Sequence, residues 1–405
     1  MAQISGISEK MHTVTVTGYN SGGDGVARLD DGRVVFIRNA ARGDVLEVAL
    51  ESARSRSARA VIVRVLSPSP YRVEPDCPVY PECGGCDFRH LSYGEELDAK
   101  LRRVNDALER VGGLALRAGA ILTTGQTSGY RNKAVFHSDG DSLGFYKAQT
   151  HDVAPISRCL LLKDDLNDAL KALAHGGDAP CETFAGPVMA GEPLAAQCTH
   201  RQRRSLPPSI TLRSGRNGLE PPLEERLDGL IFRISGFFQV NTGAALLLYN
   251  KAREYAALTK RESLIDLYCG VGALTLFVGR DAGRALGVEL DNAAVEAARE
   301  NARLNGFSHI DFIKADAASW DPGPGMANPD CVIVDPPRKG LSPCAVSKLL
   351  SLAPGRIVYV SCDPATLARD LRALKGYEAA DICAVDMFPR TANIECCCIL
   401  VRRCV

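Results

Sequence analysis

The sequence has no apolar run close to the roughly 18 residues that a membrane-spanning helix needs, so no membrane contact is expected. Its first residues, MAQISGISEKMHTV, have neither the basic start nor the apolar centre of a secretory signal, which predicts a cytoplasmic protein. It also has no net charge, because 48 Lys and Arg balance 48 Asp and Glu, and this balance by itself argues against a nucleic-acid partner. No internal repeat or low-complexity segment is visible, and the composition, 46% hydrophobic, is that of an ordinary globular protein.

The even balance conceals a local basic patch. Residues 33–72 carry only three acidic residues, Asp44, Glu47 and Glu51, against eight arginines: Arg33, Arg38, Arg42, Arg54, Arg56, Arg59, Arg64 and Arg72. Such a cluster indicates a local basic surface, although a solvated charged face has the same composition. Arg131 and Lys133 in YRNKAVFHS are further candidates for contacts with a phosphate backbone. The run HRQRRS at 200–205 could serve likewise or could be a charged loop.

Two or three domains are expected, because 405 residues exceed what one compact core accommodates. Residues 8–68 alternate short strand patterns with glycine turns, which is typical of a small β-barrel. Residues 76–234 predict an irregular antiparallel α+β domain. Residues 235–405 alternate strand and helix patterns and predict a Rossmann-like α/β domain with a mainly parallel sheet. A helix is expected over 93–113, where it could pack on the C-terminal domain; its apolar residues at helical spacing are Leu97, Leu101, Val104, Leu108 and Val111.

Fifteen cysteines in a cytoplasmic protein should be mostly reduced, so their spacing points to metal ligands or nucleophiles before disulfides. Cys77, Cys83 and Cys86 form a C-x5-C-x2-C cluster, which indicates a metal centre. Tetrahedral ligation needs a fourth ligand, for which Cys159 is the best candidate; the rivals are Cys181 and Cys198. On spacing alone, both zinc and an iron–sulfur cluster remain open.

The last third of the chain has acidic residues and glycines where strands should end. DLYCGVG places Asp266, Gly270 and Gly272 at the first strand-to-helix turn, where glycines let the backbone approach a ligand. Glu289 in GVELD lies 23 residues after Asp266, where a carboxylate can bind ribose hydroxyls, and Asp316 ends the third strand. Because the full G-x-G-x-x-G pattern is missing, a single adenosine fits better than a dinucleotide. The set resembles the S-adenosylmethionine pocket of Rossmann-like methyltransferases.

Three further residues suggest the chemistry. The turn DPPRKG, with Asp335, is similar to the base-binding turn of amino-group methyltransferases, but Arg338 stands where those enzymes have an aromatic residue. Cys362 ends the fifth strand, in VSCDP. Its thiolate could add to carbon 6 of uracil and so make the unreactive carbon 5 able to accept a methyl group. Glu395, at the start of an apolar final strand, is the candidate base that removes the carbon 5 proton, since burial would raise its pKa.

The motifs FFQVN, DLYCGVGALTL, GVELD, DPPRKGL, VSCDPATLARDL and FPRTANIE resemble, in this order, those of the RNA (uracil-5-)-methyltransferase family, from about residue 10 to the end. The resemblance implies that Cys362 is the nucleophile and Glu395 the base, and that Asp335 contacts the target uracil. It also places on cofactor-binding positions Gln239, Tyr268, Gly270, Gly272, Glu289, Asp316 and Asp335. One departure is Asn393, where the family usually has histidine two residues before the base.

The resemblance extends to the other two domains. The N-terminal barrel is similar to the TRAM domain, an oligonucleotide-binding-type module. The cysteine spacing is similar to that of the branch in which Cys77, Cys83, Cys86 and Cys159 would bind a [4Fe-4S] cluster with a structural or RNA-positioning role. This combination implies 5-methyluridine formation in 23S rRNA, with a tRNA thymine loop as the alternative and an amino-group methyltransferase as the rival class. The partner expected is RNA rather than DNA, and the protein is expected to be a monomer.

Overall fold

The structure is a computed structural model that describes residues 10–174, 207–216, 218–219, 223–234, 236–323 and 325–403. Cys181, Cys198 and the basic run 200–205 lie outside the described residues. The chain divides into two compact units. Unit 1 comprises residues 1–75, 87–126 and 224–405, and unit 2 comprises residues 76–86 and 127–223. The segment 76–234, predicted as one central domain, is therefore shared between the units, because residues 87–126 and 224–234 group with unit 1.

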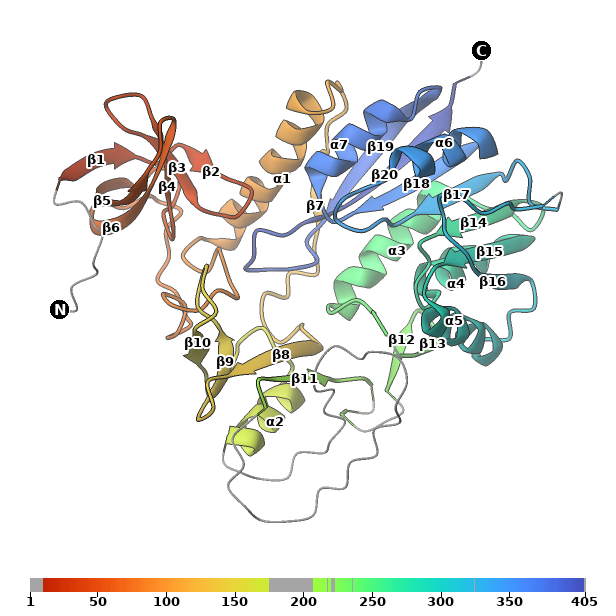
Figure 1. Cartoon of the computed structure of the whole chain (residues 1–405), viewed down its shortest axis with the longest axis horizontal. Coiled ribbons are helices and arrows are strands. Elements are labelled where there is room, and N and C mark those ends of the chain that lie inside the picture. The colour runs from red at the N-terminus through yellow and green to blue at the C-terminus, as the bar shows by residue number, and fades with distance from the viewer. Residues whose placement is uncertain are drawn as a thin grey trace. The chain divides into compact units, whose positions relative to one another are not determined.

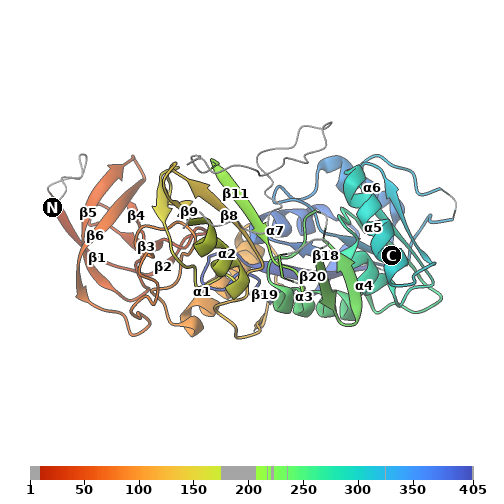
Figure 2. The same ribbon diagram turned by 90° about the horizontal axis from the view of Figure 1, so that it is seen from below.

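The N-terminal part of unit 1 is a six-stranded, mostly antiparallel sheet in the order β1-β5-β6-β4-β3-β2 (Figures 1 and 2). Alternate side chains along these strands are buried and form a small apolar core, as the period of two in a strand predicts. This is the predicted small barrel. Its strands are β1 Met11–Thr15, β2 Gly18–Tyr19, β3 Gly25–Arg28, β4 Val34–Ile37, β5 Val45–Ala53 and β6 Ser57–Ser67.

Two arginines of the predicted basic patch serve the fold. Arg72 forms an ion pair with the fully buried side chain of Asp44. Arg42 donates two hydrogen bonds to the Glu95 carboxylate, at 2.9 and 2.7 Å. Glu95 lies in helix α1, Tyr93–Arg110, so Arg42 ties the barrel to that helix. Fewer than eight arginines of the patch are therefore available to bind RNA phosphates.

The C-terminal part of unit 1 is an eight-stranded sheet in the order β16-β15-β14-β17-β18-β20-β19-β7. The first five strands in this order, β16, β15, β14, β17 and β18, are parallel to one another, and β20 is antiparallel to both β18 and β19. The edge strand β7 comes from the N-terminal half of the chain and runs parallel to β19. The strands are β7 Ile121–Leu122, β14 Ser263–Leu267, β15 Arg284–Glu289, β16 Ile310–Lys314, β17 Cys331–Val334, β18 Arg356–Ser361, β19 Tyr377–Val385 and β20 Glu395–Arg402.

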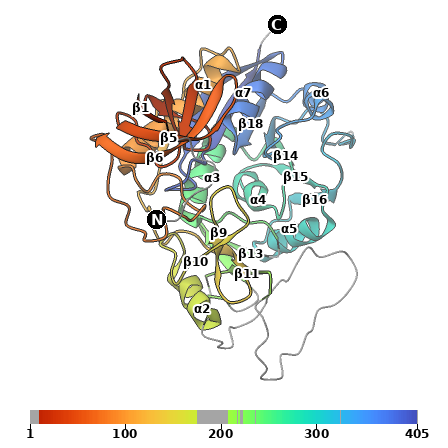
Figure 3. The ribbon, with the colours of Figure 1, turned by 60° about the vertical axis from the view of Figure 1, so that its left-hand side comes forward.

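Helices cover both faces of this sheet, as a doubly wound fold requires (Figure 3). One face packs against α3 Thr242–Ala256, α4 Ala273–Gly279 and α5 Asn292–Leu304. The other packs against α1, α6 Pro343–Leu352 and α7 Pro364–Ala373, with Val104 and Leu108 of α1 in the apolar core. A hairpin of β12 Glu224–Leu227 and β13 Leu230–Arg233 precedes α3. The predicted Rossmann-like fold is thus present, with α1 as part of its covering layer.

Unit 2 contains an antiparallel sheet in the order β10-β9-β8-β11, packed on one face against helix α2 Asp164–Ala174. Its strands are β8 Lys133–Ser138, β9 Leu143–Tyr146, β10 Val153–Pro155 and β11 Ser209–Arg213. Phe136 and Ile210 face α2, because alternate residues of a strand point to opposite faces. Across the described part of both units, no helix is long and apolar enough to cross a membrane.

Candidate active site

A small pocket lies at the carboxyl ends of the parallel strands, where ligands bind in open α/β sheets. Its wall includes four of the predicted cofactor residues, namely Gln239, Tyr268, Gly270 and Asp335. Asp266 of β14 and Tyr249 of α3 complete its acidic and aromatic side. Residues more than 90 positions apart therefore meet where the sequence predicted one site.

The turn after β14 has a backbone that favours glycine. Gly270 and Gly272 have φ angles of 54° and 80°, in the left-handed region. A Cβ atom on Gly272 would lie 2.8 Å from the Phe312 ring, so the glycine also allows close packing. Tyr268 has a φ of 68°, which is strained for a residue with a side chain and typical of functional sites. The sequence signal for this turn was the pair of glycines; the strained tyrosine carried no local signal.

Two other predicted cofactor residues flank the pocket. The Glu289 carboxylate accepts hydrogen bonds from the backbone N–H groups of Gly270, Leu290 and Asp291, at 3.0, 2.7 and 2.9 Å. These bonds fix its orientation beside the glycine turn. Asp316 is exposed after β16, and its Oδ1 accepts from the Ala318 N–H. The charge of Asp316 also contributes, after burial, to the raised pKa of Tyr268, which places it near the pocket wall.

The pocket concentrates buried acidic groups. Burial raises the pKa of Asp266 to about 8 and that of Asp335 to about 7. Asp266 Oδ2 accepts from the Thr275 hydroxyl at 2.5 Å, whereas its buried Oδ1 has no hydrogen-bond partner among the described residues. An unsatisfied buried carboxylate oxygen suits a ligand that brings a donor or a positive charge. These two acidic side chains therefore fit S-adenosylmethionine, which carries an ammonium group and a sulfonium.

Cys362 directly follows β18, and Glu395 is the first residue of the neighbouring strand β20. Strands β18 and β20 pair in a register that ends at Ser361 opposite Cys396. Cys362 follows Ser361 in a bend just beyond the paired residues, and Glu395 directly precedes Cys396, so both residues lie next to the end of this ladder. Burial, followed by the charges of Glu395 and Asp335, raises the pKa of Cys362 to about 11, and Arg338 lowers it. The charge of Glu395 thus acts on the Cys362 thiol although the two residues are 33 positions apart in the sequence.

Glu395 is buried, and burial raises its pKa well above the usual range; Asp335 raises it further and Arg338 lowers it. Arg338, which follows the Pro-Pro turn, is the cation that lowers the pKa of both Cys362 and Glu395. Its presence counts against an amino-group methyltransferase, and its charge acts on both the Cys362 thiol and the Glu395 carboxyl group. Asn393, the departure from the family pattern, is exposed, and its backbone N–H donates to the Thr391 hydroxyl.

Asn241 was not predicted as a site residue, although it ends the motif FFQVN. Its side chain accepts from the Ala244 N–H and so caps α3, while its amide donates to the Met387 carbonyl at 3.1 Å. It therefore joins the motif to the segment that leads to Glu395. The sequence signal was an asparagine directly before a helical pattern.

The four cysteines predicted as cluster ligands all belong to unit 2. Cys83 is buried, and its sulfur accepts the Gly85 backbone N–H at 3.4 Å; Cys77, Cys86 and Cys159 are half-buried. In the described residues, no three His, Cys, Asp or Glu side chains are arranged as metal ligands. The side chains as placed therefore do not form a ligand set, and an iron–sulfur domain is not shown.

The predicted RNA-contacting residues of unit 2 lie at the start of β8, of which Lys133 is the first residue and which Arg131 precedes by two positions. Lys133 of β8 is directly opposite Arg213 of β11, and the Arg131 Nε donates to the Lys133 carbonyl at 3.0 Å. Burial lowers the pKa of Lys133, and the charges of Arg213 and Arg131 lower it further. Like charges at opposed strand positions destabilise a sheet unless an anion compensates them. Arg131, Lys133 and Arg213 thus bring three basic side chains to one end of this sheet.

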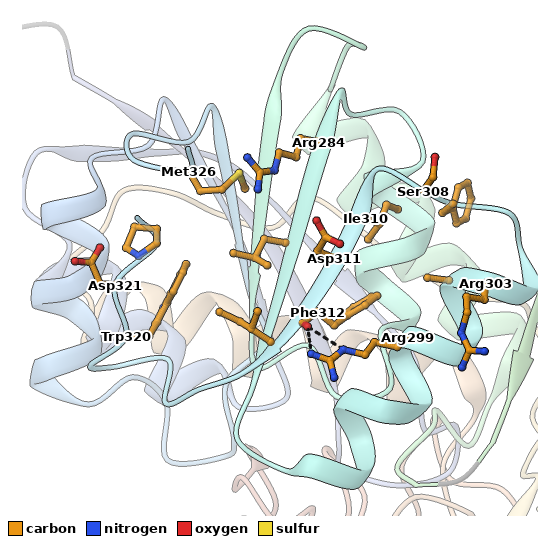
Figure 4. Close-up of a pocket in the computed structure, with 15 residues that line it drawn as sticks. Arg284, Arg299, Arg303, Ser308, Ile310, Asp311, Phe312, Trp320, Asp321 and Met326 are labelled. Atoms are coloured by element: carbon orange, nitrogen blue, oxygen red, sulfur yellow. Dashed lines mark hydrogen bonds between the residues drawn. The ribbon is translucent and has the colours of Figure 1, made fainter. Parts of the chain in front are cut away.

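A second, larger hollow of 660 Å³ follows the edge strand β16 (Figure 4). Trp320 and Met326 line one side and Arg303 the other. The Arg299 guanidinium donates twice to the Phe312 carbonyl, at 3.1 and 2.8 Å, and so caps part of the exposed strand edge. Capping an edge in this way protects it from pairing with another chain. None of the predicted site residues lines this hollow.

The fold and the pocket define the class as a Rossmann-like methyltransferase. Residues 236–355 match the methyltransferase small domain, residues 326–403 match the tRNA (Uracil-5-)-methyltransferase family, and residues 10–63 match the TRAM domain. A crystal structure of Pyrococcus abyssi tRNA (uracil-54, C5)-methyltransferase in complex with S-adenosyl-L-homocysteine has the same fold, with a TM-score of 0.69. The two chains are 24% identical, and the match covers 96% of this chain and 99% of that one.

Two relatives show the family. An RNA methyltransferase of Gloeobacter violaceus, named as uncharacterized, is 33% identical over an alignment of 446 residues, and one of Halalkalibacterium halodurans is 32% identical over 441 residues. Each alignment covers 96% of both chains. The chain therefore belongs to the RNA methyltransferases of the uracil-5 family, which depend on S-adenosylmethionine. This confirms the resemblance given by the sequence motifs.

Proposed function

We propose that this protein methylates carbon 5 of a specific uridine in 23S rRNA, with Cys362 as nucleophile and Glu395 as base. The observation that carries the proposal is the pairing of β18 with β20, in which Ser361 lies opposite Cys396, next to Cys362 and Glu395. The charges of Glu395 and Asp335 act on the pKa of Cys362, which supports their proximity. A thiol and a carboxyl group at the ends of neighbouring strands can reach adjacent carbons of one pyrimidine ring. An amino-group methyltransferase needs neither group.

In the proposed reaction the Cys362 thiolate forms a bond to carbon 6, and the ring becomes an enolate that is nucleophilic at carbon 5. S-adenosylmethionine, when bound, supplies an electrophilic methyl group. Glu395 then takes the proton from the methylated carbon 5, after which the carbon–sulfur bond breaks and the thiolate leaves. Asp335 contacts the uracil, and Gln239, Tyr268, Gly270, Gly272, Glu289 and Asp316, together with Asp335, hold the cofactor. The pocket wall and the fixed Glu289 carboxylate support this assignment.

The elevated pKa of Cys362 is compatible with this chemistry. In the free protein burial keeps it a thiol, which protects it from oxidation. The positive charge of Arg338 lowers the pKa of Cys362 and so favours the thiolate. A flipped uridine in the site would exclude water and strengthen that interaction, because Coulomb forces grow in a medium of lower dielectric.

The test is covalent trapping. Purified protein, S-adenosylmethionine and RNA transcripts that contain 5-fluorouridine should yield a protein–RNA adduct that survives denaturation, because fluorine cannot leave carbon 5 as a proton does. Cys362→Ala should give no adduct and no methylation. An active Cys362→Ala variant would instead favour the amino-group reading. Failure of the wild-type protein to form an adduct while it still methylates RNA would overturn the mechanism.

The substrate is the finer part of the proposal. The TRAM domain together with the cysteine cluster favours 23S rRNA. A thymine-loop uridine of tRNA is the alternative, supported by the name of the Pyrococcus abyssi relative in structure. Labelled cofactor incubated with separate 23S rRNA and tRNA transcripts, followed by mapping of the methylated nucleotide, decides between them. Label in tRNA alone would refute the rRNA assignment.

We also propose a [4Fe-4S] cluster held by Cys77, Cys83, Cys86 and Cys159. The C-x5-C-x2-C spacing, the presence of all four cysteines in unit 2 and the N–H bond to the Cys83 sulfur support it. Binding would have to draw the four side chains together. Protein purified without air should contain about four irons and should absorb near 400 nm, and Cys86→Ser should lose both properties. Zinc in place of iron would overturn the assignment.

A further inference from the structure

Helix α1 contacts two chain segments, one that carries Cys362 and one that leads to Glu395. Arg103 lies in the middle of this helix. Its Nη1 donates to the Ala392 carbonyl oxygen at 2.8 Å, and its Nη2 lies 3.5 Å from Asp363 Oδ2. Asp363 directly follows Cys362, and Ala392 precedes Glu395 by three residues. One guanidinium group therefore joins the segment that carries the thiol to the segment that carries the base.

The Asp363 carboxylate is itself held firmly. Its Oδ1 accepts the backbone N–H groups of Ala365 and Thr366, at 2.9 and 2.8 Å, and so caps α7. The remaining oxygen, Oδ2, faces Arg103. Asp363 thus has one oxygen on helix α7 and one on helix α1, and Cys362 sits next to this fixed point.

The segment before Glu395 is anchored to α1 at a second place. Lys100 Nζ donates to Asp386 Oδ1 at 2.7 Å, to Glu96 Oε1 at 2.8 Å and to the Phe388 carbonyl at 3.1 Å. The Arg390 backbone N–H donates to Glu96 Oε1 at 2.6 Å. The Lys100, Glu96 and Asp386 side chains are all fully buried, so these bonds are shielded from water. The segment 386–392 is consequently fixed to α1 along its length, with Arg103 at the end nearest Glu395.

We propose that Arg103 is a positioning residue for methyl transfer, which sets the separation between the Cys362 sulfur and the Glu395 carboxylate. This inference rests on the proposed function. In that reaction the sulfur is bonded to carbon 6 while the carboxylate must reach the proton on the adjacent carbon 5. A misplacement of about 1 Å in such an arrangement can cost about 100-fold in rate. Arginine suits the task because its planar, rigid fork can bind two acceptors at once, which a lysine ammonium on a flexible stem does less well.

The test compares Arg103→Met and Arg103→Lys in the full-length protein with the wild type. The matched control is Arg110→Met, on the last turn of the same helix, whose exposed side chain pairs, among the residues that the structure describes, only with Asp106. Turnover, the KM for RNA and the affinity for S-adenosylmethionine are measured, together with the amount of covalent protein–RNA adduct formed with ordinary uridine RNA. Circular dichroism gives the folded fraction of each variant.

Arg103→Met is expected to lower kcat by about 10- to 100-fold, with the KM for RNA and the cofactor affinity within about twofold of the wild type. Because the displaced carboxylate removes the carbon 5 proton slowly, the adduct should accumulate relative to released product. Arg103→Lys should recover part of kcat, and Arg110→Met should behave as the wild type.

Two results would overturn the inference. One is a kcat for Arg103→Met within twofold of the wild type. The other is a decrease in kcat that is fully explained by the unfolded fraction of the variant, without accumulation of the covalent adduct. Failure of the proposed function looks different, since the wild-type protein would then not methylate carbon 5 and would not be trapped by 5-fluorouridine.

Discussion

Replacing Lys100 by methionine is expected to lower the free energy of unfolding of unit 1 by about 3–5 kcal/mol. Removing one partner of a buried ion pair has a cost of this size, because the other charge stays buried without compensation. Lys100 is enclosed with two carboxylates, Glu96 and Asp386, at 2.8 and 2.7 Å, and methionine replaces its stem without its charge. Arg390, 3.5 Å from Glu96, compensates only one of them.

The size of the loss should depend on pH. Burial raises the pKa of Glu96, and Lys100 is the strongest of the influences that lower it. Without Lys100 this pKa rises further, so Glu96 in the folded variant is protonated at a higher pH than in the unfolded chain. A carboxyl group whose folded pKa is raised destabilises the fold only above its unfolded pKa. The deficit should therefore be largest near pH 8 and should shrink as the pH falls toward 5.

Urea unfolding followed by fluorescence measures the effect in unit 1 alone. The chain has a single tryptophan, Trp320, which is buried in the core of the methyltransferase sheet. The double variant Lys100→Met, Glu96→Gln is the matched control, since it removes one charge of each sign and should recover part of the loss. A deficit for Lys100→Met below about 1 kcal/mol at pH 8, or one that does not change with pH, would refute the reasoning.

Three further outcomes are expected. Glu395→Gln should accumulate a methylated covalent adduct with ordinary RNA on denaturing gels, because the thiolate cannot leave until the carbon 5 proton is removed; normal turnover would contradict the assignment of the base. Between pH 6 and 8, calorimetry should show S-adenosylmethionine binding more tightly as the pH rises, because Asp266 and Asp335, with pKa values raised by burial to about 8 and 7, ionise in this range. S-adenosylhomocysteine has the same ammonium group but no sulfonium, so its affinity should rise less, and a constant affinity ratio would count against the place of these carboxylates at the cofactor. Lys133→Gln should weaken RNA binding and reduce the slope of log affinity against log salt by about 1, whereas Arg158→Gln, which removes an exposed arginine paired with a carboxylate in the same unit, should not; equal slopes would argue against a phosphate contact.

The elements of the methyltransferase sheet could be predicted because their signals are local. A glycine pair after an apolar strand, and single acidic residues at strand ends, place Gly270, Glu289 and Asp316 without knowledge of the tertiary fold. The pairing of Cys362 with Glu395 was inferred from chemistry and resemblance. Its physical basis, the antiparallel insertion of β20 beside β18, depends on a register that no periodicity specifies.

The polar contacts of α1 could not be predicted, since they join residues nearly 300 positions apart. The apolar spacing over 93–113 indicated a helix that could pack on the C-terminal domain, and Val104 and Leu108 do lie in its core. A lysine within a helical pattern is usually solvated, however, whereas Lys100 is fully buried. The arginine patch was overcounted for a related reason. Arg42 and Arg72 find carboxylates at distant positions, and composition does not reveal which charges are already paired.

The strand β7 has a practical consequence for protein engineering. A protein fragment that begins at residue 235 lacks β7 and α1. Without β7 the strand β19 becomes an unpaired edge strand, and without α1 the apolar residues on the sheet face that also carries α7 are exposed. Such a fragment should therefore aggregate. Chimeras that exchange RNA specificity between relatives should therefore keep residues 87–126 with the C-terminal half, and should graft either residues 76–86 together with 127–223, or the barrel. The catalytic part of the protein is built from two separate stretches of the gene, residues 87–126 and 224–405, and an engineered variant has to take both from the same parent.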